Sequence, residues 1–229
     1  MNEFLQRFRL MLTDQQFCNL TSKKVIVFGV GGVGGNTAEM LVRSGVSNLT
    51  IVDFDKVDVT NINRQIVALQ STVGKYKVEV LKERLMDINP NLKLKAFNDI
   101  LTADNIDKFN LKDYDYVVDC IDDLPAKQNL IKYCYNNNIN IIVSCGAGNR
   151  YQNLPKFEVC DIKKTSYDKL AKLIRKFCVS ENIKKLNVVY TTEPPIKHES
   201  NTIASVVYYP VAMACTLVSF VINELLNKN

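Results

Sequence analysis

Residues 25–34 read VIVFGVGGVG, an apolar run followed by a cluster of glycines. The run Val25–Phe28 has the length of a buried strand, and Ala38, Leu41 and Val42 would form the inner face of a helix after the glycines. Glycines are needed between the two because the turn is tight and the backbone must approach a phosphate or ribose near the positive end of the helix. The stretch predicts a strand, a glycine turn and a helix that bind a nucleotide through Gly29, Gly31, Gly32 and Gly34.

An acidic residue stands where such a turn requires one. Asp53 lies 19 positions beyond Gly34, at the end of the next apolar run, where a carboxylate can bond both hydroxyls of a ribose. A glycine turn used only for packing would not explain Asp53. The order of strand, turn, helix, strand and acid therefore indicates nucleotide binding.

The wider pattern alternates strands with helices and predicts an α/β fold. Further strand-length runs are Leu49–Val52, Leu92–Phe97, Tyr116–Val118 and Ile139–Ser144. We expect a Rossmann-like, mainly parallel sheet with helices on both faces. The pattern is less regular after Gly148, so we expect a nucleotide-binding core with an N-terminal helix over residues 1–148 and a second, smaller part over residues 149–229. The two parts could equally form one domain.

The C-terminal region is unusually apolar. Residues 202–223 carry no charged side chain, but four serine or threonine residues and Pro210 interrupt the segment. We expect a strand over Val206–Tyr209 and a buried helix over Val211–Leu226, and no stable membrane insertion.

Composition favours a soluble enzyme of the reducing cytoplasm. The chain has 229 residues, of which 47% are hydrophobic, and its N-terminus lacks the apolar core of a signal peptide. Its seven cysteines form no CxxC pair, so neither a disulfide framework nor a tetrahedral zinc site has the required spacing.

The residues beyond Asp53 favour a triphosphate over NAD. Asn61–Gln65 reads NINRQ, and Lys77 stands at the start of an amphipathic helix. Arg64 and Lys77 on the phosphate side would suit ATP, whose charge grows as pyrophosphate departs. Asp122 follows another strand, where its oxygens suit Mg²⁺ bridged to phosphates. The alternatives are surface solvation for Arg64 and Lys77, and a helix cap for Asp122.

These motifs together resemble the adenylating family of ubiquitin-activating enzymes and bacterial thiamin and molybdopterin activators, which join ATP to a carboxylate and release pyrophosphate. The resemblance implies that Asp53 binds the ribose, that Asn61, Asn63 and Gln65 lie beside the nucleotide, and that Arg64 and Lys77 contact the phosphates. It implies Asp122 as the Mg²⁺ ligand. Arg7 matches an arginine that reaches the partner's ATP site in family dimers, with Arg9 as a competing match.

Four further segments are similar to the tRNA threonylcarbamoyladenosine dehydratases, and three of them lie in the second half of the chain. The matching segments are Thr60–Ile66, Val143–Gly148, Asp161–Thr165 and Val189–Glu193. The resemblance covers about residues 7–226 and implies adenylation of the threonyl carboxylate of a modified adenosine beside the tRNA anticodon, which drives ring closure. The stretch Lys156–Lys185 holds nine Lys or Arg residues against four Asp or Glu, which suits either an RNA partner or a solvated helix face.

The sequence differs in two ways from related branches of the family, and both differences argue against sulfur-transfer or thioester chemistry. The zinc cysteines of the sulfur-carrier activators are absent, and residues 199–205 carry no thiol. We interpret Cys120, Cys145 and Cys215 as buried structural cysteines, and His198, the only histidine, as outside the catalytic groups.

Three other functions stay open. The chain could activate the C-terminal glycine of a small sulfur-carrier protein, and a sulfur-transfer partner is not excluded. It could be an NAD-dependent oxidoreductase or a non-catalytic nucleotide-binding module. Arg64 with Lys77 and Asp122 argues against the last two, and the missing CxxC pairs argue against the first.

Overall fold

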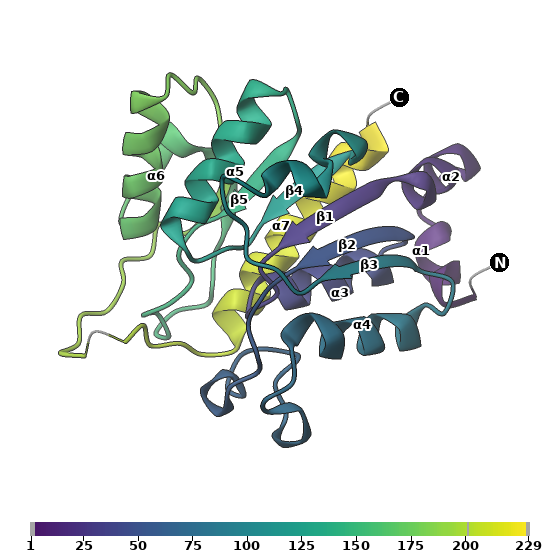
Figure 1. Ribbon diagram of the computed structural model, residues 1–229, viewed down its shortest axis with the longest axis horizontal. Helices are drawn as coiled ribbons and strands as arrows, with labels where there is room; N and C mark the ends of the chain where they lie inside the picture. Colours follow the sequence, from purple (N-terminus) through teal and green to yellow (C-terminus); the bar gives the residue numbers. More distant parts are fainter. Residues whose placement is uncertain (1–2, 201, 228–229) are drawn as a thin grey trace.

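A seven-stranded sheet organises the protein. The computed structural model describes residues 3–200 and 202–227. The sheet has the order β3-β2-β1-β4-β5-β7-β6, and every neighbouring pair is parallel except β6 with β7 (Figure 1). Its strands are β1 (Lys24–Phe28), β2 (Asn48–Val52), β3 (Lys93–Phe97), β4 (Tyr116–Asp119), β5 (Ile141–Ser144), β6 (Glu158–Asp161) and β7 (Asn187–Tyr190). The predicted Rossmann-like class is confirmed.

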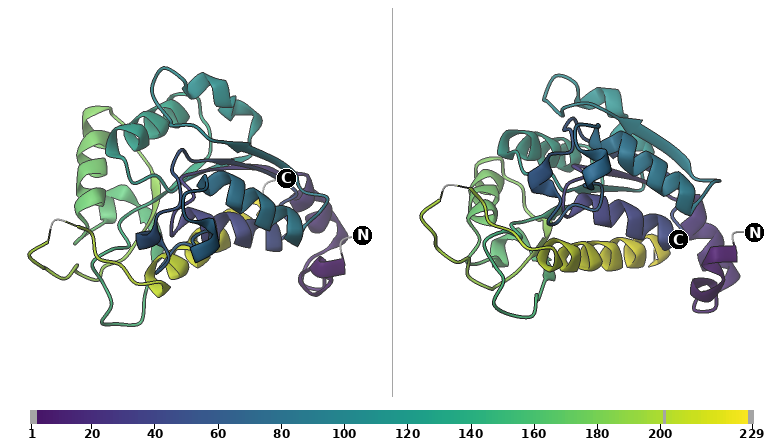
Figure 2. Two further views of the ribbon diagram at one scale, coloured as in Figure 1. Left: turned by 60° about the horizontal axis from the view of Figure 1, so that its bottom comes forward. Right: turned by 90° about the horizontal axis from the view of Figure 1, so that it is seen from below.

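Helices cover both faces of this sheet (Figures 1 and 2). Val25 and Val27 of β1 pack in one core cluster with α3, α4 and α7, whereas Ile26 and Phe28 pack in another with α5. Alternate side chains of a strand point to opposite faces, so burial on both sides explains why β1 is continuously apolar. The α-helices are α1 (Gln6–Arg9), α2 (Asp14–Ser22), α3 (Gly34–Arg43), α4 (Lys77–Ile88), α5 (Leu124–Asn136), α6 (Lys169–Ser180) and α7 (Tyr208–Asn227).

Short 3₁₀ turns occupy several connections. They are η1 (Glu3–Leu5), η2 (Val59–Asn61), η3 (Gln70–Thr72), η4 (Ile106–Phe109), η5 (Leu111–Asp113) and η6 (Ile162–Lys164). The segment that carries η2 and η3 links β2 to α4 beyond the carboxyl ends of the strands. It is the segment in which sequence analysis places several candidate site residues.

The described part of the region after residue 148 adds to the same sheet. It supplies β7, which extends the parallel order beside β5, and the antiparallel edge strand β6. It also supplies α6, and α7, which runs alongside α3 (Figure 2). The boundary near residue 148 therefore falls between strands of one sheet.

The strand expected over Val206–Tyr209 is wrong. Tyr208 already begins α7, and Pro210 lies in the first turn of that helix, where its missing N–H breaks no helical hydrogen bond. The helix expected from Val211 onward is present. The apolar residues before the proline resemble a strand in sequence, but a proline can mark a helix start as well as a break.

Helix α7 is long and apolar enough to cross a membrane by length and composition alone. Half of its most apolar window is buried within the protein. Met213, Leu217 and Val221 lie one or two turns apart and are fully buried in the core cluster that covers β1. This packing is that of a core helix.

Candidate active site

The glycine turn joins β1 to α3 at the carboxyl edge of the sheet. Gly29 has a φ of +78° and donates its N–H to the Val52 carbonyl at 2.8 Å. A Cβ on Gly34 would lie 1.8 Å from the Gly29 carbonyl oxygen, which no side chain could tolerate. Gly31 and Gly32 are less confined, since a Cβ would meet its nearest neighbours at 3.7 and 3.3 Å. The turn is tight at its ends and leaves the backbone accessible between them.

Asp53 holds this turn in place. Its Oδ2 accepts the N–H of Val30 at 2.7 Å, and its Oδ1 accepts that of Asp55 at 2.8 Å. Burial raises the pKa of Asp53, while these hydrogen bonds and Lys77 oppose the shift. Each oxygen keeps a second lone pair, so the carboxylate can fix the turn and still accept from a ribose hydroxyl.

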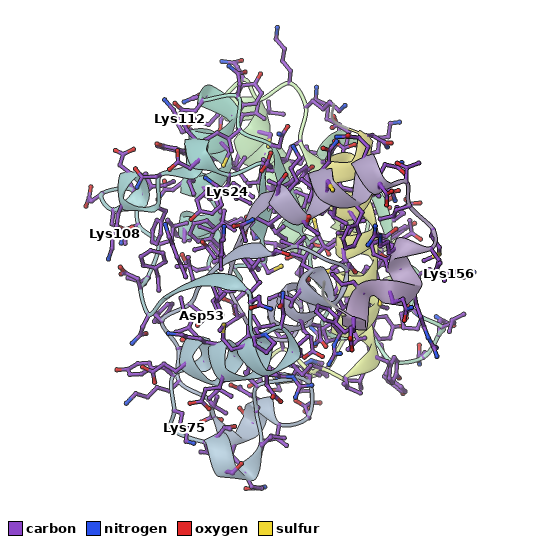
Figure 3. The ribbon with its side chains drawn as sticks, turned by 90° about the vertical axis from the view of Figure 1, so that its right-hand side faces the viewer. Lys24, Asp53, Lys75, Lys108, Lys112 and Lys156 are labelled. Carbon is purple, nitrogen blue, oxygen red and sulfur yellow. The ribbon has the colours of Figure 1, made fainter. Side chains whose placement is uncertain are left out.

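Lys77 is buried at the start of α4. It is 5% exposed, and its Nζ contacts Asp55 Oδ2 at 2.7 Å, so it is not the solvated surface lysine of the alternative interpretation. An ammonium has three N–H groups, which leaves Lys77 donors for another anion. Lys75 is exposed and lies further from the sheet than Asp53 (Figure 3). Of the two lysines, Lys77 is the one beside Asp53.

The residues of the segment Asn61–Gln65 make different contacts. Asn61 accepts the N–H of Asp58, and Asn63 donates to the Ser205 carbonyl at 2.9 Å. Arg64 is half-buried and donates to the Thr60 carbonyl and to Asn63 Oδ1, both at 2.9 Å, which orients its guanidinium.

Gln65 is 8% exposed and lies against Gly31, and within the described residues its Oε1 has no hydrogen-bond partner. A buried acceptor without a donor is costly. The amide atom nearest to Gly31 is Nε2, so Gln65 would meet a nucleotide in the accessible part of the turn through its N–H groups.

Asp122 lies exposed after the carboxyl end of β4. The helix cap considered for it belongs to its neighbour, since Asp123 accepts the N–H of Ala126 at the start of α5. Asp122 makes no hydrogen bond or ion pair within the described residues. No cluster of three metal-binding side chains occurs in that part of the chain either, so a cation here would need phosphate oxygens as further ligands.

Sequence analysis missed an ion pair behind the turn. Lys127 Nζ lies 2.9 Å from Asp119 Oδ1, and both side chains are 0% exposed. Lys127 also donates to the Ser144 carbonyl, and Asp119 accepts the N–H of Ile121. The pair thus ties α5 to the ends of β4 and β5. The sequence feature that could have revealed this pair is the helical spacing of Lys127 with Leu130, Ile131 and Cys134, which places the lysine on the apolar face of α5.

Arg7 does not join the other candidates within this chain. It is exposed on α1, and Leu5, two residues before it, packs near Gly45, which precedes β2. Arg7 therefore lies toward the amino ends of the strands, opposite the glycine turn. Arg9 pairs with Asp14 at 2.8 Å.

The cysteines and the histidine largely agree with expectation. Burial raises the pKa of Cys120 to about 12 and also raises that of Cys145. Cys215 is a correction, because it is exposed on the outer face of α7 and not buried. His198 is exposed and contacts Asn149 through Nε2 at 2.9 Å.

Comparison with known proteins gives the family. The ThiF family model matches residues 5–222. The chain belongs to the ThiF family. This ThiF-family chain is 42% identical over 191 residues to the tRNA threonylcarbamoyladenosine dehydratase of Bacillus subtilis, covering 83% of this chain and 75% of that relative. It is 40% identical over 185 residues to the Escherichia coli enzyme of that name, covering 77% and 69%. The resemblance predicted from the motifs is confirmed.

A solved structure shares the whole fold. The E. coli tRNA N6-threonylcarbamoyladenosine dehydratase, TcdA, in complex with ATP superposes with a TM-score of 0.90 at 30% identity, covering 98% of this chain and 96% of that one. The same enzyme in complex with AMP gives a TM-score of 0.89 at 31% identity, covering 95% and 91%. An adenylating site would consume ATP and release AMP, and the solved relative binds both nucleotides.

Proposed function

We propose that this ThiF-family chain is an ATP-dependent tRNA threonylcarbamoyladenosine dehydratase. The carboxylate oxygen of the threonyl group attacks the α-phosphorus of ATP, and pyrophosphate leaves. A nucleophile within the modified adenosine then attacks the activated acyl carbon, closes the ring and expels AMP, with net loss of water from the nucleoside. The observation that carries this proposal is the buried polar set around the glycine turn, seen together with relatives of this name.

Each residue of the set has a proposed role. Asp53 accepts from the ribose, while Asn61, Asn63 and Gln65 line the nucleotide. Arg64 and Lys77 stabilise the charge that develops as pyrophosphate departs, which is why a guanidinium held by two hydrogen bonds is useful. The four glycines provide the cradle.

Asp122 is the proposed ligand of Mg²⁺. When bound, the ion would neutralise phosphate charge. Asp122 suits this role because it is an exposed carboxylate beyond the end of β4, and its neighbour Asp123 already caps α5. One protein carboxylate with phosphate oxygens and water is a common way to hold Mg²⁺.

tRNA is the proposed macromolecular partner. Lys163, Lys164, Lys172 and Lys176 are exposed and can contact phosphates. Arg175 is a weaker candidate than its sequence position indicates, because its guanidinium donates to the Thr165 carbonyl at 2.8 Å and to the Thr165 hydroxyl. The phosphate contacts should therefore come mainly from the lysines.

The proposed assembly is a cytoplasmic homodimer in which Arg7 reaches the partner's ATP site. Its position at the amino ends of the strands supports this role, since Arg7 cannot serve the site of its own chain.

A sulfur-transfer protein is a further candidate partner. A related molybdopterin-synthase adenylyltransferase of Haemophilus influenzae is 29% identical over 161 residues, so activation of a small sulfur carrier is the second candidate.

Nucleoside mass spectrometry of tRNA tests the proposal in cells. tRNA is digested under mild conditions from cells with and without the gene. We expect the cyclic nucleoside only when the gene is present, and accumulation of uncyclised threonylcarbamoyladenosine in its absence. An unchanged nucleoside profile would refute the proposed substrate.

A further inference from the structure

Tyr167 has a backbone conformation that tyrosine rarely adopts. Its φ is +55°, in the left-handed region, which is unfavourable for residues with a Cβ. Asparagine tolerates this region better than most residues. Within the described chain, the other non-glycine residues with positive φ are all asparagines, namely Asn110, Asn138, Asn149 and Asn182. Tyr167 is the exception.

The next residue explains the turn. Asp168 is 7% exposed, and its Oδ1 accepts the N–H of Ala171, which caps α6. Its Oδ2 accepts the N–H of Gly146 at 2.9 Å and lies 3.9 Å from the guanidinium of Arg150. The left-handed residue before it allows one carboxylate to join the start of α6 to the loop that follows β5.

The same contacts do not explain the aromatic ring. Glycine or asparagine would make this turn at lower cost. The Tyr167 side chain is 68% exposed, and it makes no hydrogen bond, ion pair or ring contact within the described residues. The exposed ring therefore adds little to the stability of the fold, and the backbone conformation disfavours tyrosine at this position. We expect the ring to contact a partner molecule.

The location of Tyr167 indicates the kind of partner. Asp168 fixes it beside Gly146, at the carboxyl end of β5, and ligands of such sheets bind beyond these ends. β5 lies two strands from β1, or on the order of 10 Å from the glycine turn. Lys163, Lys164 and Lys169 are exposed and lie within four positions of Tyr167 in the sequence. An exposed aromatic ring among lysines is the combination that binds unpaired nucleic acid.

We propose that the ring of Tyr167 stacks on an unpaired base of the tRNA anticodon loop, next to the modified adenosine. This inference rests on the proposed function and specifies how that substrate is held. Stacking needs no particular base and would align the loop while the lysines bind its phosphates.

A single tryptophan tests the contact directly, because the chain has no tryptophan of its own. Tyr167→Trp keeps an aromatic ring at the site, and stacking on a base should quench its emission. The probe is tRNA purified from a strain that lacks its own dehydratase. Tyr133→Trp is the matched control, since Tyr133 lies in the last turns of α5 beside Asp107, toward the other end of the sheet. We expect quenching for Tyr167→Trp and none for the control.

Affinity variants separate stacking from charge. Tyr167→Asn should weaken tRNA binding by about tenfold at every salt concentration, because lost stacking changes affinity without releasing counterions. Its unfolding temperature should be equal or higher, since asparagine relieves the backbone. Tyr167→Phe should bind as the wild type does. Lys163→Gln with Lys164→Gln should instead lower the salt dependence.

The outcomes distinguish the two proposals. If the wild type cyclises the nucleoside but Tyr167→Asn binds tRNA equally well, the stacking role is wrong and the proposed function stands. Equal losses in Tyr167→Asn and Tyr167→Phe would also overturn stacking, because the phenyl ring should suffice. If the wild type neither binds nor modifies this tRNA, both proposals fail, and a protein partner for the ring follows.

Discussion

At the scale of single residues, space and charge around the glycine turn decide which side chains can be present. Gly34 has no room for a Cβ, while Gly31 faces Gln65 at an ordinary contact distance. Asp53 fixes the turn through the Val30 N–H and lies beside the Lys77 and Asp55 pair. The same few residues therefore build the turn and present its polar surface.

The two glycines give a matched pair of variants. Gly34→Ala should lower ATP affinity by about tenfold or more, because its methyl group would overlap the Gly29 carbonyl and force the turn open. Gly31→Ala should also weaken ATP binding, because its methyl group would enter the accessible part of the turn, but it should leave the free energy of unfolding nearly unchanged, whereas Gly34→Ala should lower it. Calorimetric titration with ATP and urea unfolding measure the two effects, and an equal loss of stability in both variants would contradict the geometry of the turn.

At the scale of elements, α3 and α4 are joined by charge as well as by apolar packing. Glu39 of α3 is 7% exposed and bonds Arg43 at 2.7 Å and Arg84 of α4. Burial raises the pKa of Glu39, but the two arginines together outweigh it, so the pKa lies below its ordinary value of 4.5. A depressed carboxyl pKa stabilises the fold above the unfolded value, and the gain is lost as pH falls through the folded value.

Glu39→Gln should therefore lower the free energy of unfolding by about 1 kcal/mol at neutral pH, the scale of a partly exposed ion pair. The difference from wild type should shrink toward zero as the pH falls below 4.5. Urea unfolding across pH measures it. Glu83→Gln is the control, because Glu83 is exposed on α4 and forms no ion pair within the described residues. A pH-independent difference would refute the account.

The elements also show how far sequence analysis reaches. The first five strands were predictable because each contains a mainly apolar run between turn residues, although lysines alternate with apolar residues in β3. β6 and β7 were not predicted, because Glu158–Asp161 is a polar edge strand and both strands lie where the alternation of strands and helices is less regular. The candidate site residues were found through their motifs. Lys127 and Asp168 were missed because each depends on partners in another element, Asp119 and Ser144 at the ends of β4 and β5 for the first and Gly146 after β5 for the second.

At the scale of the whole molecule, the ATP site needs a second chain if Arg7 contributes to it. Arg7 and Asp122 lie toward opposite ends of the sheet. We expect light scattering to show a dimer at micromolar concentration. Arg7→Ala and Asp122→Ala should each be inactive alone, and mixing them should restore part of the activity, because each mixed dimer keeps one intact site. A monomer, or no recovery on mixing, would exclude the shared site.

The reaction itself tests the central claim most directly. The purified protein is incubated with ATP, Mg²⁺ and tRNA from a strain without dehydratase, and nucleosides and AMP are measured together. We predict that threonylcarbamoyladenosine disappears while a nucleoside lighter by one water and AMP appear in equal amounts, and that Arg64→Ala slows the reaction by about 10²-fold. Unchanged tRNA, with adenylation of the C-terminal glycine of a small carrier protein instead, would contradict the account.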